Sequence, residues 1–194
     1  MSPLWWVAAA AGGYLVGSLS PAAVVARLRG VDLRLSGSGN PGATNAARTM
    51  GPRVGLLVGL LDVLKGFAPT YAFALVDHDL GLVAGVAAVL GHVSSPFLKG
   101  RGGRGVATSL GAILAVEPVW ALVSLLVFGL TVAATRWVAL GSMLAAVALV
   151  VSALVGHAPW PDLLFAVALA TIVELRHIPN IAHRLRHRAG PSHP

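Results

Sequence analysis

The chain has 194 residues, of which 56% are hydrophobic and only 11% are charged, and it contains no cysteine. Soluble domains carry roughly 25% charged residues, so this composition excludes an ordinary water-soluble domain and predicts an all-helical, polytopic integral membrane protein. Without cysteine there can be no disulfide, zinc–thiolate site or cysteine nucleophile. In so hydrophobic a chain the net charge of +7 indicates basic loops at an anionic membrane face, and no nucleic-acid partner is expected.

Apolar segments recur along the whole chain and predict about seven transmembrane helices in a single domain, residues 1–194. A full span needs about 20 apolar residues, so the third and fourth segments are short. Five spans with a short helical hairpin are an equally good interpretation. In chain order the predicted segments are 4–26, 54–76, 80–92, 105–116, 118–135, 137–155 and 160–175.

The basic residues lie in alternate connections between these segments. Thirteen of the 14 lysines and arginines fall on one side of the seven-segment arrangement, and Lys65 falls inside the second segment. The other connections carry Asp77, Asp79, Glu117 and Asp162 and no lysine or arginine. By the positive-inside rule the basic side is cytoplasmic, so we expect the N-terminus outside and the C-terminus in the cytoplasm.

A glycine-rich polar run occupies the first basic connection. Its glycines allow positive φ and close approach of a ligand to the backbone, and successive N–H groups in such a turn can bind an anion. A polar loop that only joins two helices remains an equally good interpretation. The candidate binding residues of this run are Gly37, Ser38, Gly39, Asn40, Thr44, Asn45 and Arg48.

A second glycine-rich run interleaves cations with glycines immediately before a predicted helix. Free N–H groups and the helix dipole favour phosphate at a helix N-terminus, and guanidinium groups match an oxyanion in shape. A cationic anchor at lipid headgroups is the alternative, although it does not explain the glycines. The candidates here are Lys99, Arg101, Gly102, Gly103, Arg104, Gly105 and Thr108.

Two further features carry ionisable groups. Asp62 and Lys65 lie three residues apart inside the second apolar segment, so they share a helix face and are expected to pair within the protein. His177 follows the last segment. It can serve as a general base or as a phosphate hydrogen-bond donor, or it can be an interfacial histidine without a role in chemistry.

Together these motifs resemble the bacterial acyl-phosphate-dependent glycerol-3-phosphate acyltransferases, the PlsY family. Residues 37–45 with Arg48 resemble the family's GSGNxGATN motif, and residues 91–108 resemble GHxFPxFLxFKGGKGVAT without a gap. His177, Asn180 and Ile181 match part of HxxNIxRL. The sequence departs from the family pattern at Ser94, Ser95, Arg101, Arg104 and His183.

The resemblance implies acyl transfer from acyl phosphate to the sn-1 hydroxyl of glycerol 3-phosphate, which gives lysophosphatidic acid and phosphate in the first step of phospholipid biosynthesis. It implies no cofactor or metal, contact with membrane lipids, and a multi-pass protein of the bacterial inner membrane with a cytoplasmic active site. Ser38, His177 and Asn180 are the implied catalytic residues. Ser142 joins the substrate-binding residues on the resemblance alone.

An anion or organophosphate transporter is the alternative function, with the glycine-rich basic loops as a substrate gate. Transporters often contain inverted repeats, and the two halves of this sequence show no convincing repetition of the motifs. A small assembly or scaffold protein would leave the motifs unexplained. The oligomeric state and the acyl-chain preference are not indicated by the sequence.

Overall fold

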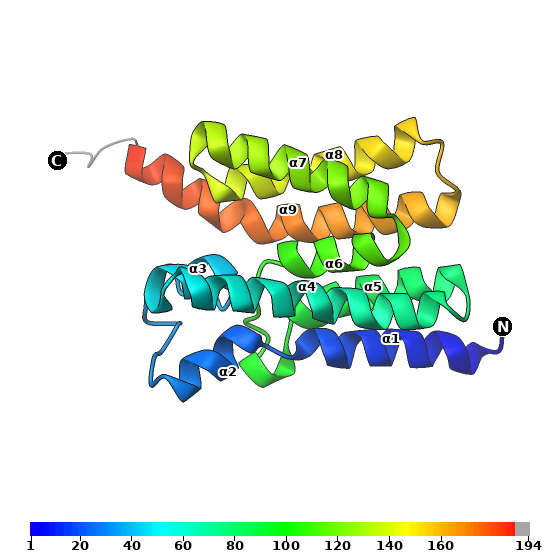
Figure 1. The fold of residues 1–194 in the computed structure, drawn as a ribbon, viewed down its shortest axis with the longest axis horizontal. Helices are drawn as coiled ribbons and strands as arrows, with labels where there is room; N and C mark the ends of the chain where they lie inside the picture. Colours follow the sequence, from blue (N-terminus) through cyan, green and yellow to red (C-terminus); the bar gives the residue numbers. More distant parts are fainter. Residues whose placement is uncertain (189–194) are drawn as a thin grey trace.

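Nine α-helices and one 3-10 helix make up residues 1–188, the part of the chain that this computed structural model describes, apart from the side chains of Asn180 and residues 182–188 (Figure 1). The helices run roughly along one axis and the described chain begins and ends at opposite ends of the bundle. They are α1 (Pro3–Ser18), α2 (Pro21–Leu28), α3 (Ala43–Met50), α4 (Pro52–Ala74), α5 (His78–Val93), η1 (Pro96–Leu98), α6 (Val106–Val116), α7 (Pro118–Thr135), α8 (Val138–Val155) and α9 (Trp160–Arg188).

The predicted apolar segments all become helical, but the first is divided into two helices and the last, expected to end at residue 175, lies in a helix that continues to Arg188. Within the described residues, five stretches are long and apolar enough to cross a membrane: Pro3–Leu28, Pro52–Ala74, His78–Leu98, Pro118–Thr135 and Val138–Val155. The third segment, expected to be short at 80–92, lies in the 21-residue stretch His78–Leu98. The fourth segment is short, as expected: α6 has 11 residues, because glycines precede it and Pro118 starts the next helix.

The first apolar segment is divided into α1 and α2 by a local break. Pro21 cannot donate a backbone hydrogen bond to the preceding turn, and the Ser20 hydroxyl accepts a bond from the Ala23 N–H at 3.3 Å to begin α2. The break leaves carbonyls without helical partners. Lys65 Nζ donates to the Leu19 carbonyl at 2.6 Å, and Ser95 Oγ donates to the Ser18 carbonyl at 2.6 Å.

Glycines allow the helices to approach one another closely. A Cβ on Gly17 of α1 would overlap the Ala88 carbonyl of α5, and a Cβ on Gly66 of α4 would overlap the Thr108 carbonyl of α6. Small residues serve this purpose in membranes, where the hydrophobic effect between helices is weak and packing must drive association. The two contacts therefore hold α1 against α5 and α4 against α6.

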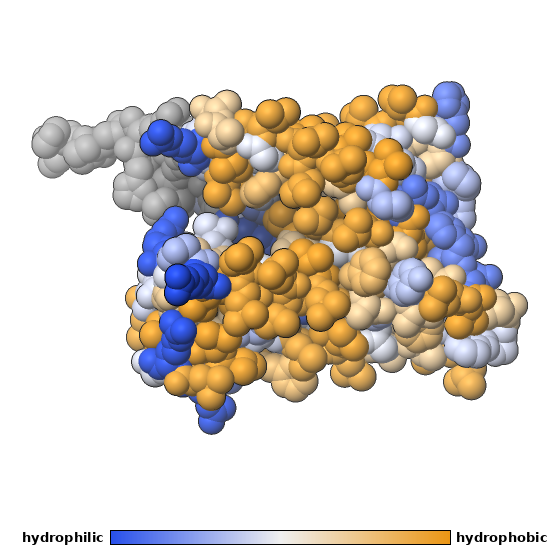
Figure 2. All heavy atoms as spheres, in the orientation of Figure 1, coloured by the Kyte–Doolittle hydropathy of each residue, from blue (hydrophilic) through white to orange (hydrophobic). Residues whose placement is uncertain are grey.

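The two ends of the bundle differ in charge, whereas its side is apolar. On the face shown in Figure 2, hydrophobic side chains cover the middle and hydrophilic ones gather at both ends. The connections with arginines all lie at one end. At the other end His78 Nε2 is 2.7 Å from Asp162 Oδ1, which ties α5 to α9.

The helix α3 was not predicted, because residues 43–50 lie in a run read as a polar loop. A helix of eight residues is marginal alone, so its stability comes from packing on α4. The contact is close: a Cβ on Gly55 would overlap the Ala47 side chain. This contact sets the first glycine-rich run against the membrane-spanning part of the bundle.

Candidate active site

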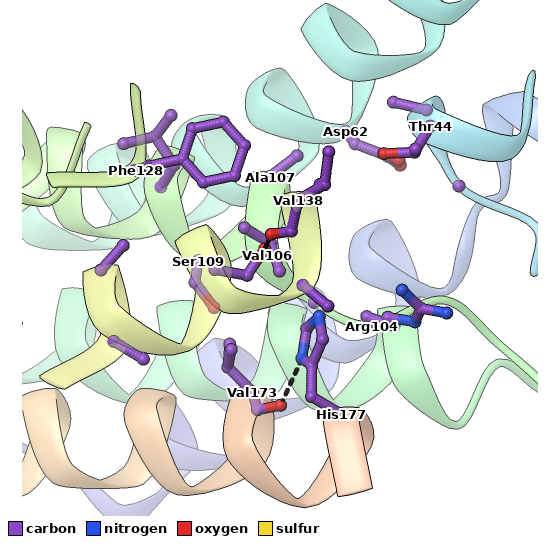
Figure 3. Close-up of a pocket in the computed structure, with 18 of the residues that line it drawn as sticks. Thr44, Asp62, Arg104, Val106, Ala107, Ser109, Phe128, Val138, Val173 and His177 are labelled. Carbon is purple, nitrogen blue, oxygen red and sulfur yellow. Dashed lines mark hydrogen bonds between the residues drawn. The ribbon is translucent and has the colours of Figure 1, made fainter. Parts of the chain in front are cut away.

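A cavity of about 850 Å³ opens at the arginine-rich end of the bundle (Figure 3). Its polar end is lined by Ser38, Asn40, Thr44, Arg48, Arg104 and His177. Its deeper walls are apolar and come from α6, α7, α8 and α9: Val106, Leu110, Ile113, Leu125, Phe128, Leu149, Leu169 and Val173. The cavity can therefore hold one molecule that is anionic at one end and apolar at the other.

Asn45 organises the first glycine-rich run around itself. Its side chain is 1% exposed and its Nδ2 donates to the carbonyls of Leu33 at 3.2 Å and Ser36 at 3.0 Å. Its Oδ1 accepts a bond from the Ser38 N–H at 2.8 Å. Gly37 has φ +61 and leaves no room for a Cβ beside this amide. Asn45 thus shapes the loop that presents Ser38 to the cavity.

Arg176, which the sequence did not single out, holds the second glycine-rich run. Its Nε donates to the Gly103 carbonyl at 3.1 Å and its Nη2 to the Gly102 carbonyl at 2.9 Å. The N–H groups of Gly102 and Gly103 donate to the carbonyls of Val93 and His92. These two glycines therefore do not lie bare for a phosphate. Glycine is required at both positions, because a Cβ on Gly103 would overlap the His92 ring and a Cβ on Gly102 would overlap the His92 carbonyl.

Guanidinium groups concentrate at the mouth of the cavity. Arg48 from α3, Arg104 from the second run and Arg136 from the α7–α8 turn all line it. Burial lowers the pKa of Arg104, and nearby Arg176 and Arg48 lower it further. Arginine stays charged despite such a shift, so the mouth holds cations that repel one another. A bound anion would relieve this repulsion.

His177 is buried, 1% exposed, and its orientation is fixed by the backbone. Its Nδ1 lies 2.7 Å from the Val173 carbonyl, which can only accept, so Nδ1 carries the proton (Figure 3). His177 lies beyond the last predicted span. Burial lowers the pKa of its ring, the hydrogen bond to Val173 raises it, and the nearby charges of Arg104 and Arg176 lower it. The neutral ring therefore keeps Nε2 as an acceptor, which is what a general base requires.

The structure brings most of the predicted site residues to this cavity and leaves others outside its lining. Thr108 is fully buried on the side of α6 that packs against α4. The side chain of Asn180 lies outside the described residues. Of the predicted residues, those that line the cavity are Gly37, Ser38, Asn40, Thr44, Asn45, Arg48, Arg104, Gly105, Ser142 and His177, and those that do not are Gly39, Lys99, Arg101, Gly102, Gly103 and Thr108.

Sequence reasoning missed Arg136 as a lining residue, because it is a lone cation in a short connection. Arg136 adopts the left-handed conformation with φ 53 at the end of α7, which no pattern in the sequence indicated. Asp62 also reaches the cavity. It forms the predicted pair with Lys65, with Oδ1 and Nζ 2.9 Å apart, and His92 Nδ1 lies 3.6 Å from the same oxygen.

An all-helical membrane bundle with a half-cationic, half-apolar cavity defines a class of protein that handles anionic lipids. Comparison with known proteins makes the assignment specific. The sequence model of the glycerol-3-phosphate acyltransferase family matches residues 7–187. The glycerol-3-phosphate acyltransferase of Trichlorobacter lovleyi is 43% identical to this chain, and the alignment covers 92% of each of the two chains. That of Moorella thermoacetica is also 43% identical, and the alignment covers 97% of this chain and 96% of the relative.

Solved structures agree with these relatives. The crystal structure of PlsY, an integral membrane glycerol 3-phosphate acyltransferase, in its glycerol 3-phosphate form superposes with a TM-score of 0.91 at 38% identity, covering 94% of this chain and 93% of that one. The lysophosphatidic acid form gives a TM-score of 0.88 at 36% identity. The chain belongs to the glycerol-3-phosphate acyltransferase family, and its predicted membership and its helical membrane fold are confirmed.

Proposed function

We propose that this protein transfers the acyl group of an acyl phosphate to the sn-1 hydroxyl of glycerol 3-phosphate and releases lysophosphatidic acid and phosphate. The observation that carries the proposal is the cavity itself, in which guanidinium groups line the mouth and apolar side chains of four helices line the interior. Relatives of known structure contain glycerol 3-phosphate or lysophosphatidic acid, and both molecules fit this division.

The cations would hold the two phosphate groups side by side. Arg48 comes from α3 and Arg104 from the second glycine-rich run; burial, with the nearby charges of Arg176 and Arg48, lowers the pKa of Arg104. Two phosphorylated substrates repel each other in water. A mouth that already contains several guanidinium groups offsets this repulsion and aligns the reactants. Alignment of the reactants is a large source of rate for an enzyme whose donor is already activated.

The acyl chain would occupy the interior. The α6 wall contributes Leu110 and Ile113, and the α7 wall contributes Leu125 and Phe128. Each buried methylene of the chain gains about 0.8 kcal/mol on leaving water. This arrangement favours the orientation of the donor in which its phosphate meets the cations, so that the reactive carbonyl would lie where the polar and apolar parts of the cavity meet.

The chemistry requires removal of one proton and departure of one phosphate. The sn-1 hydroxyl attacks the acyl carbonyl carbon, and the C–O bond to phosphate breaks with its electron pair on the phosphate. The hydroxyl proton passes to the phosphate or to His177 Nε2, whose lone pair is directed by the Nδ1 bond to Val173. Ser38 and Asn180 are assigned to this catalytic centre, in contact with the substrates, on the family motifs.

We place this reaction at the cytoplasmic side of a bacterial inner membrane. The basic loops all lie at the cavity end of the bundle, and the acidic connections, including Asp162 with its partner His78, lie at the other. The positive-inside rule assigns the basic end to the cytoplasm, where glycerol 3-phosphate is available as a water-soluble substrate.

Purified protein in detergent tests the proposal directly. It should convert glycerol 3-phosphate with palmitoyl phosphate and not with palmitoyl-CoA. Ser38→Ala and Arg104→Ala should each lower the rate at least 100-fold, while Ser152→Ala, which removes a hydroxyl bonded within α8, should not. Equal rates with the thioester, or uptake of unchanged glycerol 3-phosphate into proteoliposomes without product, would contradict it.

A further inference from the structure

Two serine hydroxyls in the cavity are buried without a hydrogen-bond partner. Ser109 of α6 and Ser124 of α7 are 5% and 6% exposed, and both line the cavity. Among the described residues neither Oγ has a partner. Ser142 lines the same cavity, yet its Oγ donates to the Val138 carbonyl at 3.0 Å. Ser109 and Ser124 thus differ from a serine that is satisfied by its own helix.

The two hydroxyls lie at the same depth. α6 and α7 are neighbours in contact that run in opposite directions from the connection at Glu117. Ser109 precedes Glu117 by eight residues and Ser124 follows it by seven. At 1.5 Å per residue both are therefore about 10–12 Å from that connection. Two facing helices contribute one hydroxyl each to the same level of the cavity.

On α6 this level lies close to Arg104, one of the cations of the mouth. Ser109 is on the first turn of α6, and the preceding loop carries Arg104. In Figure 3 the Ser109 hydroxyl points toward the α9 wall with Val173 and His177. An acyl group whose phosphate is held by Arg104 has only one further polar atom, the carbonyl oxygen, and that atom would lie one or two bonds inside the mouth.

A buried hydroxyl without a partner costs about 1–3 kcal/mol, so a pair of them facing an apolar chain is unfavourable unless the ligand supplies an acceptor. We propose, on the basis of the function proposed above, that Ser109 and Ser124 donate hydrogen bonds to the carbonyl oxygen of the acyl group. The ligand they recognise is an acyl phosphate or an acyl ester, with its carbonyl at the depth of these two serines.

The role follows from the electron flow. When the sn-1 hydroxyl oxygen bonds to the carbonyl carbon, the carbonyl π pair moves to the oxygen, which becomes an oxyanion. The two Oγ–H groups strengthen their bonds to that negative charge. The pair then returns to re-form C=O, and the C–O bond to phosphate breaks with its electrons on the phosphate. The positive end of the α6 dipole, one turn away from Ser109, favours the same charge.

Kinetics with palmitoyl phosphate give the first test. Ser109→Ala and Ser124→Ala should each lower kcat by about 10- to 1000-fold, the range for loss of one oxyanion donor, with KM for glycerol 3-phosphate unchanged. Ser109→Thr keeps the hydroxyl and should restore most of the rate. Ser152→Ala is the matched control, and thermal unfolding in detergent verifies that each variant is folded. Wild-type kcat in both alanine variants overturns the proposal.

The carbonyl stretch of bound lysophosphatidic acid, labelled with ¹³C at the ester carbonyl, gives a readout independent of turnover. The infrared band should lie at lower wavenumber in the wild-type protein than in Ser109→Ala or Ser124→Ala, because a hydrogen bond weakens C=O. An unshifted band overturns the proposal. If the band shifts and palmitoyl phosphate is not a donor, the acyl-phosphate function fails and the carbonyl site stands. If no bound band is seen in the wild type, both fail.

Discussion

Arg176 on α9 donates a 3.1 Å hydrogen bond from its Nε to the carbonyl of Gly103, in a loop 73 residues earlier in the chain. Its Nη2 holds the neighbouring carbonyl of Gly102 at 2.9 Å. The next residue in that loop is Arg104, which lines the cavity. The last helix thereby helps to hold in place a cation of the cavity lining that comes from a distant loop.

Arg176→Ala should lower the acyl transfer rate by about 10- to 100-fold, because charge-assisted hydrogen bonds are worth about 1.5–3 kcal/mol. Arg176→Lys should be intermediate, since one ammonium cannot bind two carbonyls in a planar fork. Rates with saturating palmitoyl phosphate check both variants. An unchanged rate in the alanine variant, with the protein folded, would show that the loop needs no support from α9.

Gly103→Ala should reduce both the activity and the unfolding temperature, because the new methyl group would overlap the His92 ring. The ring cannot yield easily, since His92 is 7% exposed. Gly129→Ala in α7 is the matched control: among the described residues nothing lies within 4 Å of the added Cβ, and alanine is the better helix former. Thermal unfolding in detergent measures both. Equal behaviour of the two variants would contradict the packing role of Gly103.

Lys65→Met should destabilise the protein by about 3–5 kcal/mol, because it leaves the buried Asp62 carboxylate without its cation. It also removes the 2.6 Å bond to the Leu19 carbonyl. The double variant Asp62→Asn, Lys65→Met should be more stable than the sum of the two single losses predicts. Lys99→Met, which alters the chain's other lysine at an exposed position, is the control. Additive losses in a double-mutant cycle would exclude coupling between Asp62 and Lys65.

At the far end of the bundle, burial and the neighbouring Asp162 raise the pKa of Glu117, partly offset by His78. A carboxyl with a raised pKa binds more protons in the folded state, so the stability it contributes is present at low pH and is lost as pH rises through its titration. Glu117→Gln should therefore raise the unfolding temperature at pH 7 and change it little at pH 4. A larger gain at pH 4 than at pH 7 would reverse the sign of this effect.

The sequence predicted the helical membrane fold well because lipid imposes a simple requirement. Every backbone polar group must be satisfied inside the segment, so apolar runs become helices whatever their neighbours are. The short α6 was expected, since residues 105–116 are too few to span. The helix α3 was not, because its eight residues gain their stability from contact with Gly55 of α4, and such a contact has no local signal.

The candidate site was predicted in part. Ser38, Arg48, Arg104 and His177 reach one cavity, as motifs on a common side of the membrane suggested. Gly102 and Gly103, predicted as binding residues, do not line the cavity; they lie against His92 and offer carbonyls to Arg176. That partnership joins residues more than 70 positions apart, which spacing within one loop does not reveal.

The cavity joins two media, and this has a consequence for how the proposed reaction is measured. In the proposed reaction one reactant arrives dissolved in water, whereas the donor and the product would keep their tails among the side chains of α6 to α9 and belong to the bilayer. Turnover should then follow the mole fraction of donor in the surface, not its concentration in the bulk. Adding inert lipid while the total amount of donor stays constant would lower the donor's mole fraction in the membrane and slow the enzyme. Adding buffer alone would leave that mole fraction, and its effect on the rate, unchanged.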